Sequence, residues 1–69
     1  MTNLQKEVIL TFASCGMNVS KTSRKMYIHR NSIMYHLNKI KENTGLDPQD
    51  FYDLIVLVKI AEVVTDGTS

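Results

Sequence analysis

The stretch from residue 18 to residue 45 constrains the fold of this chain more than any other part of the sequence. It reads N-V-S-K-T-S-R-K-M-Y-I-H-R-N-S-I-M-Y-H-L-N-K-I-K-E-N-T-G, with the helix-capping residue Asn18 at its start and the helix-stopping residue Gly45 at its end. Apolar residues recur at helical spacing in two runs between them, 19–26 and 29–44. The pattern predicts a short helix, a tight break and a longer helix rich in basic and polar residues.

The longer of these helices has two contrasting faces. Ile33, Leu37 and Ile40 recur at helical spacing and predict a side that faces the core. The opposite side carries polar and ring-bearing residues, namely Asn31, Tyr35, Asn38 and Glu42. A short helix, a tight break and a basic helix with a polar face form the outline of a helix-turn-helix, whose second helix enters the major groove of DNA.

Two further helices are predicted on either side of this unit. The first has an apolar stripe formed by Leu4, Val8, Phe12 and Cys15. At its start, Thr2 and Gln5 could form a capping box, with Asn3 as the competing cap, and Gly16 is expected to end it. The last is expected to take Asp47 as its cap and Pro48 as its first helical residue. The β-branched run 55–58 would also suit a buried strand, but the cap and the continuation through 59–62 favour a helix.

The sequence therefore predicts an all-α fold, a four-helix helix-turn-helix domain. The expected helices span about 4–15, 19–26, 29–44 and 48–64. One domain, 1–64, would contain them all, and the tail, 65–69, is expected to be disordered. A chain of 69 residues is long enough for one small domain and too short to enclose a deep substrate pocket.

The last helix is apolar nearly all round, so more than one of its faces must be buried or paired. One face is expected to pack in the core through Phe51, Leu54, Ile55, Val58 and Ala61. Another is expected to form the seam of a homodimer through Leu57, Ile60, Val63 and Val64. In a longer chain, the same residues would instead pack against a sensory domain.

Charge is distributed unevenly, although the net charge is only +1. Residues 18–41 contain no acid and hold Lys21, Arg24, Lys25, Arg30, Lys39 and Lys41. Among the charged residues of 42–69, six are acids and one, Lys59, is a base. This asymmetry is expected when one face of a protein meets phosphates, and a solvated basic surface beside an acidic helix is an equally weighted alternative.

The single cysteine, Cys15, excludes an intrachain disulfide and suggests a reducing compartment, so a cytoplasmic location is expected. The N-terminus lacks the pattern of a secretory signal. The apolar run 54–64 is interrupted by Lys59 and Glu62 and is too short to span a bilayer, so no membrane association is expected.

His29, His36 and Cys15 are the residues that would have to form a metal or nucleophile site. The two histidines lie about two helical turns apart, and no other ligand completes the three or four that a metal needs. Cys15 fits the apolar stripe of its helix, where cysteine is usually inert. Without a glycine-rich phosphate loop or a carboxylate pair, no enzyme activity, metal or cofactor is expected.

The chain resembles the C-terminal helix-turn-helix domain of the PucR/CdaR-type regulators of purine and sugar-diacid catabolism. That family carries a run close to G-N-V-S-x-T-A-R-x-L-x-I-H-R-N-T-L-x-Y-R-L and then a T-G-L-D turn. Here the run stands as G-M-N-V-S-K-T-S-R-K-M-Y-I-H-R-N-S-I-M-Y-H-L, with T-G-L-D at residues 44–47. The match covers all four predicted helices. More distantly, residues 18–37 resemble the DNA-binding end of the Fis-type nucleoid proteins.

The resemblance implies a transcription regulator that binds double-stranded DNA. The residues that it assigns to DNA are Arg30, Asn31, Ser32 and Tyr35 on the longer helix, with Asn18 and Ser20 at the start of the shorter one. Lys21 and Lys39 are expected to contact the DNA backbone as well. The chain departs from the family at Met34 and His36, where basic residues are usual, and at the extra residue Met17.

Residue chemistry supports some of these assignments. The Arg30 fork matches guanine O6 and N7, whereas Asn31 would either pair with adenine or merely cap its helix. The short hydroxyls of Ser20 and Ser32 suit phosphate oxygens. The rival hypothesis is a protein-interaction module that docks a partner on its apolar last helix.

Overall fold

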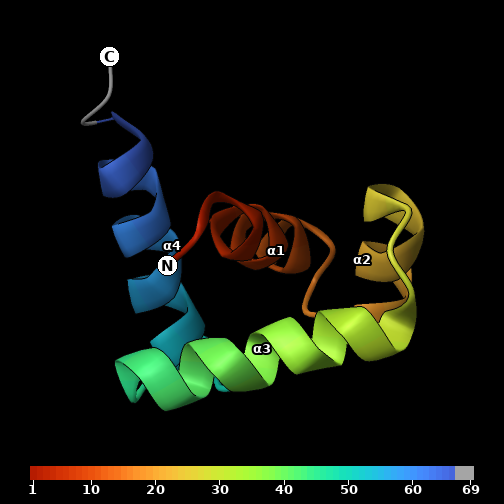
Figure 1. Ribbon diagram of the computed structural model, residues 1–69. Coiled ribbons are helices and arrows are strands. Elements are labelled where there is room, and N and C mark those ends of the chain that lie inside the picture. Colours follow the sequence, from red (N-terminus) through yellow and green to blue (C-terminus); the bar gives the residue numbers. More distant parts are fainter. Residues whose placement is uncertain (67–69) are drawn as a thin grey trace.

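The computed structural model describes the backbone of residues 1–66 and the side chains of residues 1–62, and within them the chain is all-α. The helices are α1 (Asn3–Ser14), α2 (Val19–Met26), α3 (Arg30–Thr44) and α4 (Phe51–Asp66). Figure 1 shows α3 running along one side of the molecule, with α2 near its N-terminal end, α4 near its C-terminal end and α1 between them. The predicted fold class is confirmed. No helix in the described part is long and apolar enough to cross a membrane.

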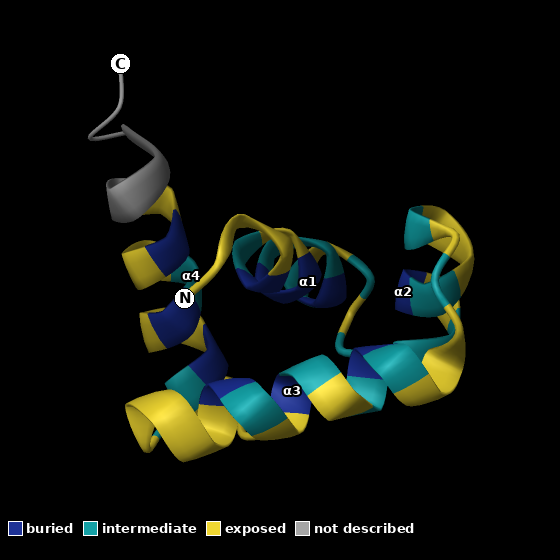
Figure 2. Cartoon of the chain, viewed as in Figure 1, coloured by how far each residue is buried: buried dark blue, intermediate teal, exposed yellow. Residues whose placement is uncertain are grey.

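The core lies where α1, α3 and α4 face one another, as the buried segments in Figure 2 show. Each of these helices contributes three apolar side chains: Val8, Ile9 and Phe12; Ile33, Leu37 and Ile40; and Leu54, Leu57 and Ala61. The inward stripe predicted for the third helix is thus confirmed. From α2, the fully buried side chain is Thr22, whose hydroxyl donates to the Asn18 carbonyl.

The start of α1 is fixed by the predicted capping box. The Thr2 hydroxyl accepts from the Gln5 backbone N–H, and the Gln5 side chain accepts from the Thr2 N–H. Gln5 is consequently drawn inward and is only 8% exposed, while Leu4 is 41% exposed. The prediction that Leu4 belongs to the buried stripe was wrong, because the regular stripe of this helix starts at Gln5 and continues through Val8 and Phe12.

The end of α1 contains two consecutive left-handed residues. Gly16 adopts the left-handed conformation, its N–H donates to the Ala13 carbonyl, and the N–H of Met17 reaches back to the Phe12 carbonyl. This is the double hydrogen bond of a Schellman motif. Met17 is itself left-handed, with φ of 63°, so a second left-handed residue leads into the start of α2.

The break between α2 and α3 repeats this motif with a tyrosine in place of glycine. Tyr27 is left-handed, with φ of 56°, and is 96% exposed. The N–H of Ile28 donates to the Ser23 carbonyl, while the Ser23 hydroxyl donates to the Ile28 carbonyl. Ile28 packs against the core. The hydroxyl of Ser23 therefore closes the turn.

The turn before α4 differs from the prediction. The Asp50 carboxylate accepts from the Asp53 backbone N–H, so α4 starts at Phe51 and Asp50 caps it. The Asp47 carboxylate instead accepts from the Gln49 N–H, within a turn that buries Pro48. Asp47 as the cap and Pro48 as the first helical residue were therefore wrong. At the other end, α4 continues through residues 65–66, which were expected in the tail, and residues 67–69 lie outside the described part of the chain.

Candidate nucleic-acid interface

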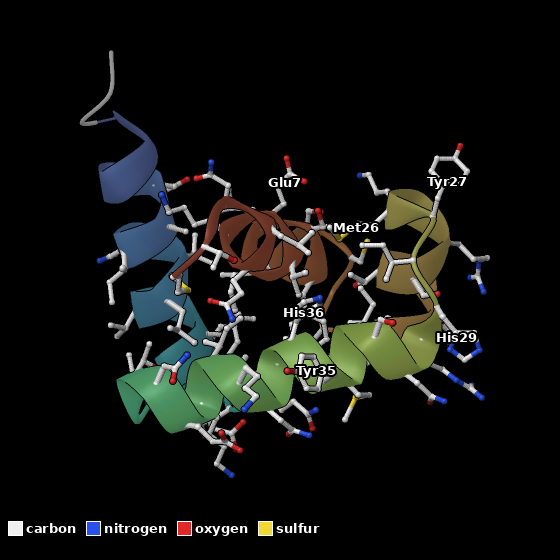
Figure 3. The ribbon with its side chains drawn as sticks, in the orientation of Figure 1. Glu7, Met26, Tyr27, His29, Tyr35 and His36 are labelled. Atoms are coloured by element: carbon white, nitrogen blue, oxygen red, sulfur yellow. The ribbon has the colours of Figure 1, made fainter. Side chains whose placement is uncertain are left out.

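The side of α3 that faces away from the core is exposed over its length. Asn31, Asn38 and Glu42 are exposed there, and Tyr35, which is 58% exposed, stands out from the helix in Figure 3. These positions recur at the spacing of one helical face, directly opposite the buried stripe. The buried stripe fixes the rotation of α3 about its axis, so the residues on the opposite side of the helix are the ones presented outward.

The first turn of α3 presents its polar groups without competition from neighbours. Arg30 and Asn31 are exposed, and the Arg30 guanidinium has no ion pair or hydrogen bond to any residue whose side chain is described. Ser32 is half-buried, and its backbone N–H donates to the His29 carbonyl. Arg30 and Asn31 thus have side chains that are free to bind a ligand, whereas Ser32 is only partly accessible.

One turn further along, the exposed side chains contact one another. The Tyr35 ring meets the His36 ring edge-on at 5.5 Å, and the Lys39 ammonium lies 5.7 Å from the Tyr35 ring centre. Lys39 also forms an ion pair with Glu42 at 3.5 Å. This acid is the first after the acid-free stretch 18–41. The favourable surface for an anion is therefore the N-terminal half of α3.

The start of α2 carries the remaining predicted DNA contacts. The Asn18 side-chain oxygen accepts from the Lys21 backbone N–H at 2.9 Å and caps the helix, as predicted. Lys21 is exposed and Ser20 is half-buried. Because the Asn18 oxygen is engaged by the cap, the group that this side chain can still offer to a phosphate is its amide NH₂.

The two positions that depart from the family's basic pattern are turned partly inward. Met34 is half-buried, and its sulfur lies 3.6 Å from the Gln49 side-chain nitrogen in the loop before α4. His36 points from α3 toward α1 in Figure 3, and its Nδ1 is buried without a partner among the described residues. These two side chains belong to the packing of α3 and contribute little to its exposed face.

The predicted dimer seam is only partly at the surface. Leu57 is 0% exposed and belongs to the core, so its assignment to an interface was wrong. The sequence of a helix that is apolar on every side does not indicate which stripe faces inward. In α4, the stripe that packs in the core contains Leu54, Leu57 and Ala61. Ile60 is 39% exposed. The side chains of Val63 and Val64 lie outside the described residues.

His29 was predicted as the first residue of the helix 29–44 but was not among the residues predicted to contact DNA. Its ring caps α3, because Nδ1 accepts from the Asn31 backbone N–H at 3.0 Å. Its position at the predicted helix start was an available signal for a cap. Histidine is not among the usual N-cap residues, however, and whether its ring accepts depends on which nitrogen carries the proton.

The buried three-helix core, the tight turn and the exposed polar face of α3 define a helix-turn-helix domain. Residues 6–60 match the model of the family described as the PucR C-terminal helix-turn-helix domain. The chain belongs to this family, which is a family of DNA-binding domains of transcription regulators and not of enzymes.

Proteins from several bacteria share this similarity. The carbohydrate diacid regulator of Escherichia coli is 50% identical over 36 residues, which are 52% of this chain and 9% of that protein. The uncharacterized protein Rv2242 of Mycobacterium tuberculosis is 33% identical over 57 residues, or 83% of this chain and 14% of that protein. YxkF of Bacillus subtilis is 33% identical over 46 residues, or 67% of this chain and 16% of that protein. The chain thus spans a small part of the length of these relatives. No solved structure matches significantly.

Proposed function

We propose that this domain binds double-stranded DNA in a sequence-specific manner, with α3 in the major groove, as part of a transcription regulator. The observation that carries the proposal is the first turn of α3, where Arg30 and Asn31 are both exposed. An unpaired guanidinium matches the two acceptors of guanine, and an exposed carboxamide matches adenine. Such a regulator would act in the cytoplasm of a bacterium, where its DNA is.

The remaining contacts in this proposal go to the DNA backbone. Lys21, the Asn18 amide and the Ser20 hydroxyl at the start of α2 would approach one phosphate, while Lys39 and Tyr35 would approach another along α3. The half-buried Ser32 would contribute less than Arg30 or Asn31. These contacts orient α3 in the groove without specifying the sequence.

The test is fluorescence-anisotropy binding to a randomised duplex pool at two salt concentrations, followed by selection of the preferred site. We expect Arg30→Ala to weaken binding to the selected site by roughly ten- to hundredfold, the scale of a lost bidentate base contact. Lys6→Ala is the matched control, because Lys6 is a cation on α1 that belongs neither to the proposed DNA contacts nor to the proposed dimer face. If neither the wild type nor any variant bound DNA at low salt, the proposal would be wrong.

We also propose that the domain dimerises through the outer face of α4, with a second copy of this chain as the partner. Tyr52, Val56 and Ile60 recur along that face and are 76%, 44% and 39% exposed. The exposed Lys59 and Glu62 lie close by with opposite charges, so an antiparallel pair of α4 helices can match each charge with its opposite. This face replaces the seam that included Leu57.

The arrangement of the helices favours a second copy at this face. Figure 1 shows α4 beside the C-terminal end of α3, far from its first turn. The 15 residues of α3 span about 22 Å. A two-fold axis at α4 would therefore carry the two first turns outward on opposite sides, as binding to two half-sites requires.

Size-exclusion chromatography with light scattering tests the dimer, using Val56→Lys as the disrupting variant. Leu4→Lys is the matched control, because Leu4 is exposed to a similar extent, 41% against 44%, but lies on α1. A wild-type monomer at high protein concentration would overturn the dimer. In that case, the next hypothesis to test would be that another domain of a longer chain packs against this face.

The second candidate function is a protein-interaction module, and one observation favours it. An open apolar groove runs between the end of α1 and α4, lined by residues that include Ala13, Met17, Phe51 and Ile55. Phe51 is 59% exposed at its edge. Salt distinguishes the two functions, because DNA affinity should fall steeply with added salt whereas docking of an apolar partner should change little.

A further inference from the structure

The side chain of His29 is held in one orientation at the start of α3. Its Nδ1 accepts the Asn31 backbone N–H at 3.0 Å. Its carbonyl accepts the N–H groups of Ser32 and Ile33 at 2.9 and 3.2 Å. Backbone and ring are therefore both tied to the first turn, and the ring has little freedom to rotate.

This hydrogen bond determines which ring nitrogen carries the proton. A nitrogen that accepts an N–H has a free lone pair, so in the neutral ring the hydrogen is on Nε2, which is a donor. The ring is exposed, and Figure 3 shows it at the N-terminal end of α3, pointing away from the helices. Among residues 1–62, no acceptor binds Nε2. The chain also has no acid between residues 18 and 41 that would compete for it.

Histidine can do something at this position that a usual capping residue does not. A capping aspartate has acceptor oxygens only, and the short hydroxyl of a capping serine ends close to the helix, whereas the imidazole caps with one nitrogen and presents an N–H on its far side with the other. The donor is orientated before any ligand arrives, so little conformational entropy is lost when it binds. Its neighbour along the chain is Arg30, the best candidate for reading a base.

We propose that His29 is a DNA-contact residue, whose Nε2–H donates to a non-bridging phosphate oxygen at the edge of the groove occupied by α3. This inference rests on the proposed DNA-binding function and adds a contact to it. A phosphate is the favoured acceptor because His29 precedes the helix, so its ring lies at the groove edge when the following residues point inward. A single neutral N–H also matches a single phosphate oxygen and lacks the paired geometry of a base contact.

The test uses His29→Ser, because serine is among the best N-cap residues and preserves the cap while removing the extended Nε2–H donor. His29→Thr is a second variant that keeps the cap. Thermal unfolding should change little for either variant. Binding at pH 8 should weaken by about tenfold, as expected for a lost hydrogen bond to a charged group, on both the selected duplex and the randomised pool.

Salt dependence separates this contact from that of Arg30. A neutral donor releases no counterion, so His29→Ser should leave the slope of log affinity against log salt unchanged, whereas Arg30→Ala should reduce it by about one if Arg30 meets a phosphate. Long-range ¹H–¹⁵N NMR spectra of the wild type should show a proton on Nε2 and none on Nδ1.

Each outcome decides the matter. Wild-type affinity in the two cap-preserving variants would show that His29 only caps α3, and a loss confined to the selected duplex would indicate a base contact instead. A proton on Nδ1 would also overturn the proposal. DNA binding by the wild type that depends on Arg30 but not on His29 would leave the proposed function intact and remove only this contact.

Discussion

The Lys39 ammonium lies 5.7 Å from the centre of the Tyr35 ring and, on its other side, 3.5 Å from a carboxylate oxygen of Glu42. The lysine is thus shared between an aromatic face that leaves it available to an anion and an acid that neutralises it. All three side chains are substantially exposed, and exposed ion pairs stabilise a protein by only about 0–1 kcal/mol. A DNA phosphate can therefore displace the Glu42 carboxylate from Lys39, but the two anions compete for the lysine.

The first prediction concerns this competition. Glu42→Gln should tighten DNA binding by roughly two- to fivefold at low salt, because it releases Lys39 and removes a negative charge from the proposed reading face. Fluorescence anisotropy on the selected duplex measures the change. Glu7→Gln alters the same charge on α1 and should have a smaller effect. Equal gains in the two variants would mean that only the net charge of the domain matters.

The second prediction concerns the turn. Tyr27 occupies a left-handed conformation that strains a residue with a Cβ by about 1–2 kcal/mol, and its ring is 96% exposed. Tyr27→Gly should therefore raise the free energy of unfolding by about 0.5–1 kcal/mol, after the added entropy of the unfolded glycine chain is subtracted. Urea denaturation followed by circular dichroism measures it.

Met17 is the control for that prediction. It is also left-handed, with φ of 63°, but its side chain packs against the core. Met17→Gly relieves the same strain and loses this packing, so its unfolding free energy should not rise above that of the wild type. Stabilisation of both variants to the same extent would show that the Met17 packing contributes nothing measurable.

The parts of the fold that the sequence predicted well are those governed by local chemistry. Gly45 stops α3 in the left-handed conformation, and Thr2 with Gln5 forms the capping box, because both effects act within one helical turn. The inward stripe of α3 was also clear, since Ile33, Leu37 and Ile40 alternate with strongly polar positions. The exposed face of α3 follows from that stripe by geometry.

The parts that were mispredicted depend on contacts between helices or on competing caps. In α4, apolar residues surround the axis, so the hydrophobic pattern has no direction and the burial of Leu57 depends on how α4 packs against α1 and α3. Asp47 and Asp50 are both good caps, and only the closed turn around the buried Pro48 decides between them. The His29 cap depends on a ring tautomer, which no sequence pattern encodes.

The third prediction distinguishes core from surface along α4. Leu57→Ala should lower the free energy of unfolding by about 2–5 kcal/mol, which in so small a domain would unfold a large fraction of molecules. Ile60→Ala, at a position 39% exposed, should change it by less than about 1 kcal/mol. Urea denaturation at low protein concentration measures both, so that association does not contribute. A larger loss at Ile60 than at Leu57 would contradict the assignment of Leu57 to the core.

The fourth prediction concerns the start of α4. Because the Asp50 carboxylate accepts the Asp53 backbone N–H at 3.0 Å, Asp50→Ala should reduce the free energy of unfolding by about 0.5–2 kcal/mol. Asp50→Asn keeps an acceptor at the cap and should cost only a few tenths of a kcal/mol. Asp47→Ala should lose the weaker exposed contact with Lys41, at 3.7 Å, and the hydrogen bond within the turn, but leave the first turn of α4 capped. Circular dichroism and urea denaturation compare the three variants, and a drop in helix content for Asp47→Ala but not for Asp50→Ala would place the helix start at Pro48 after all.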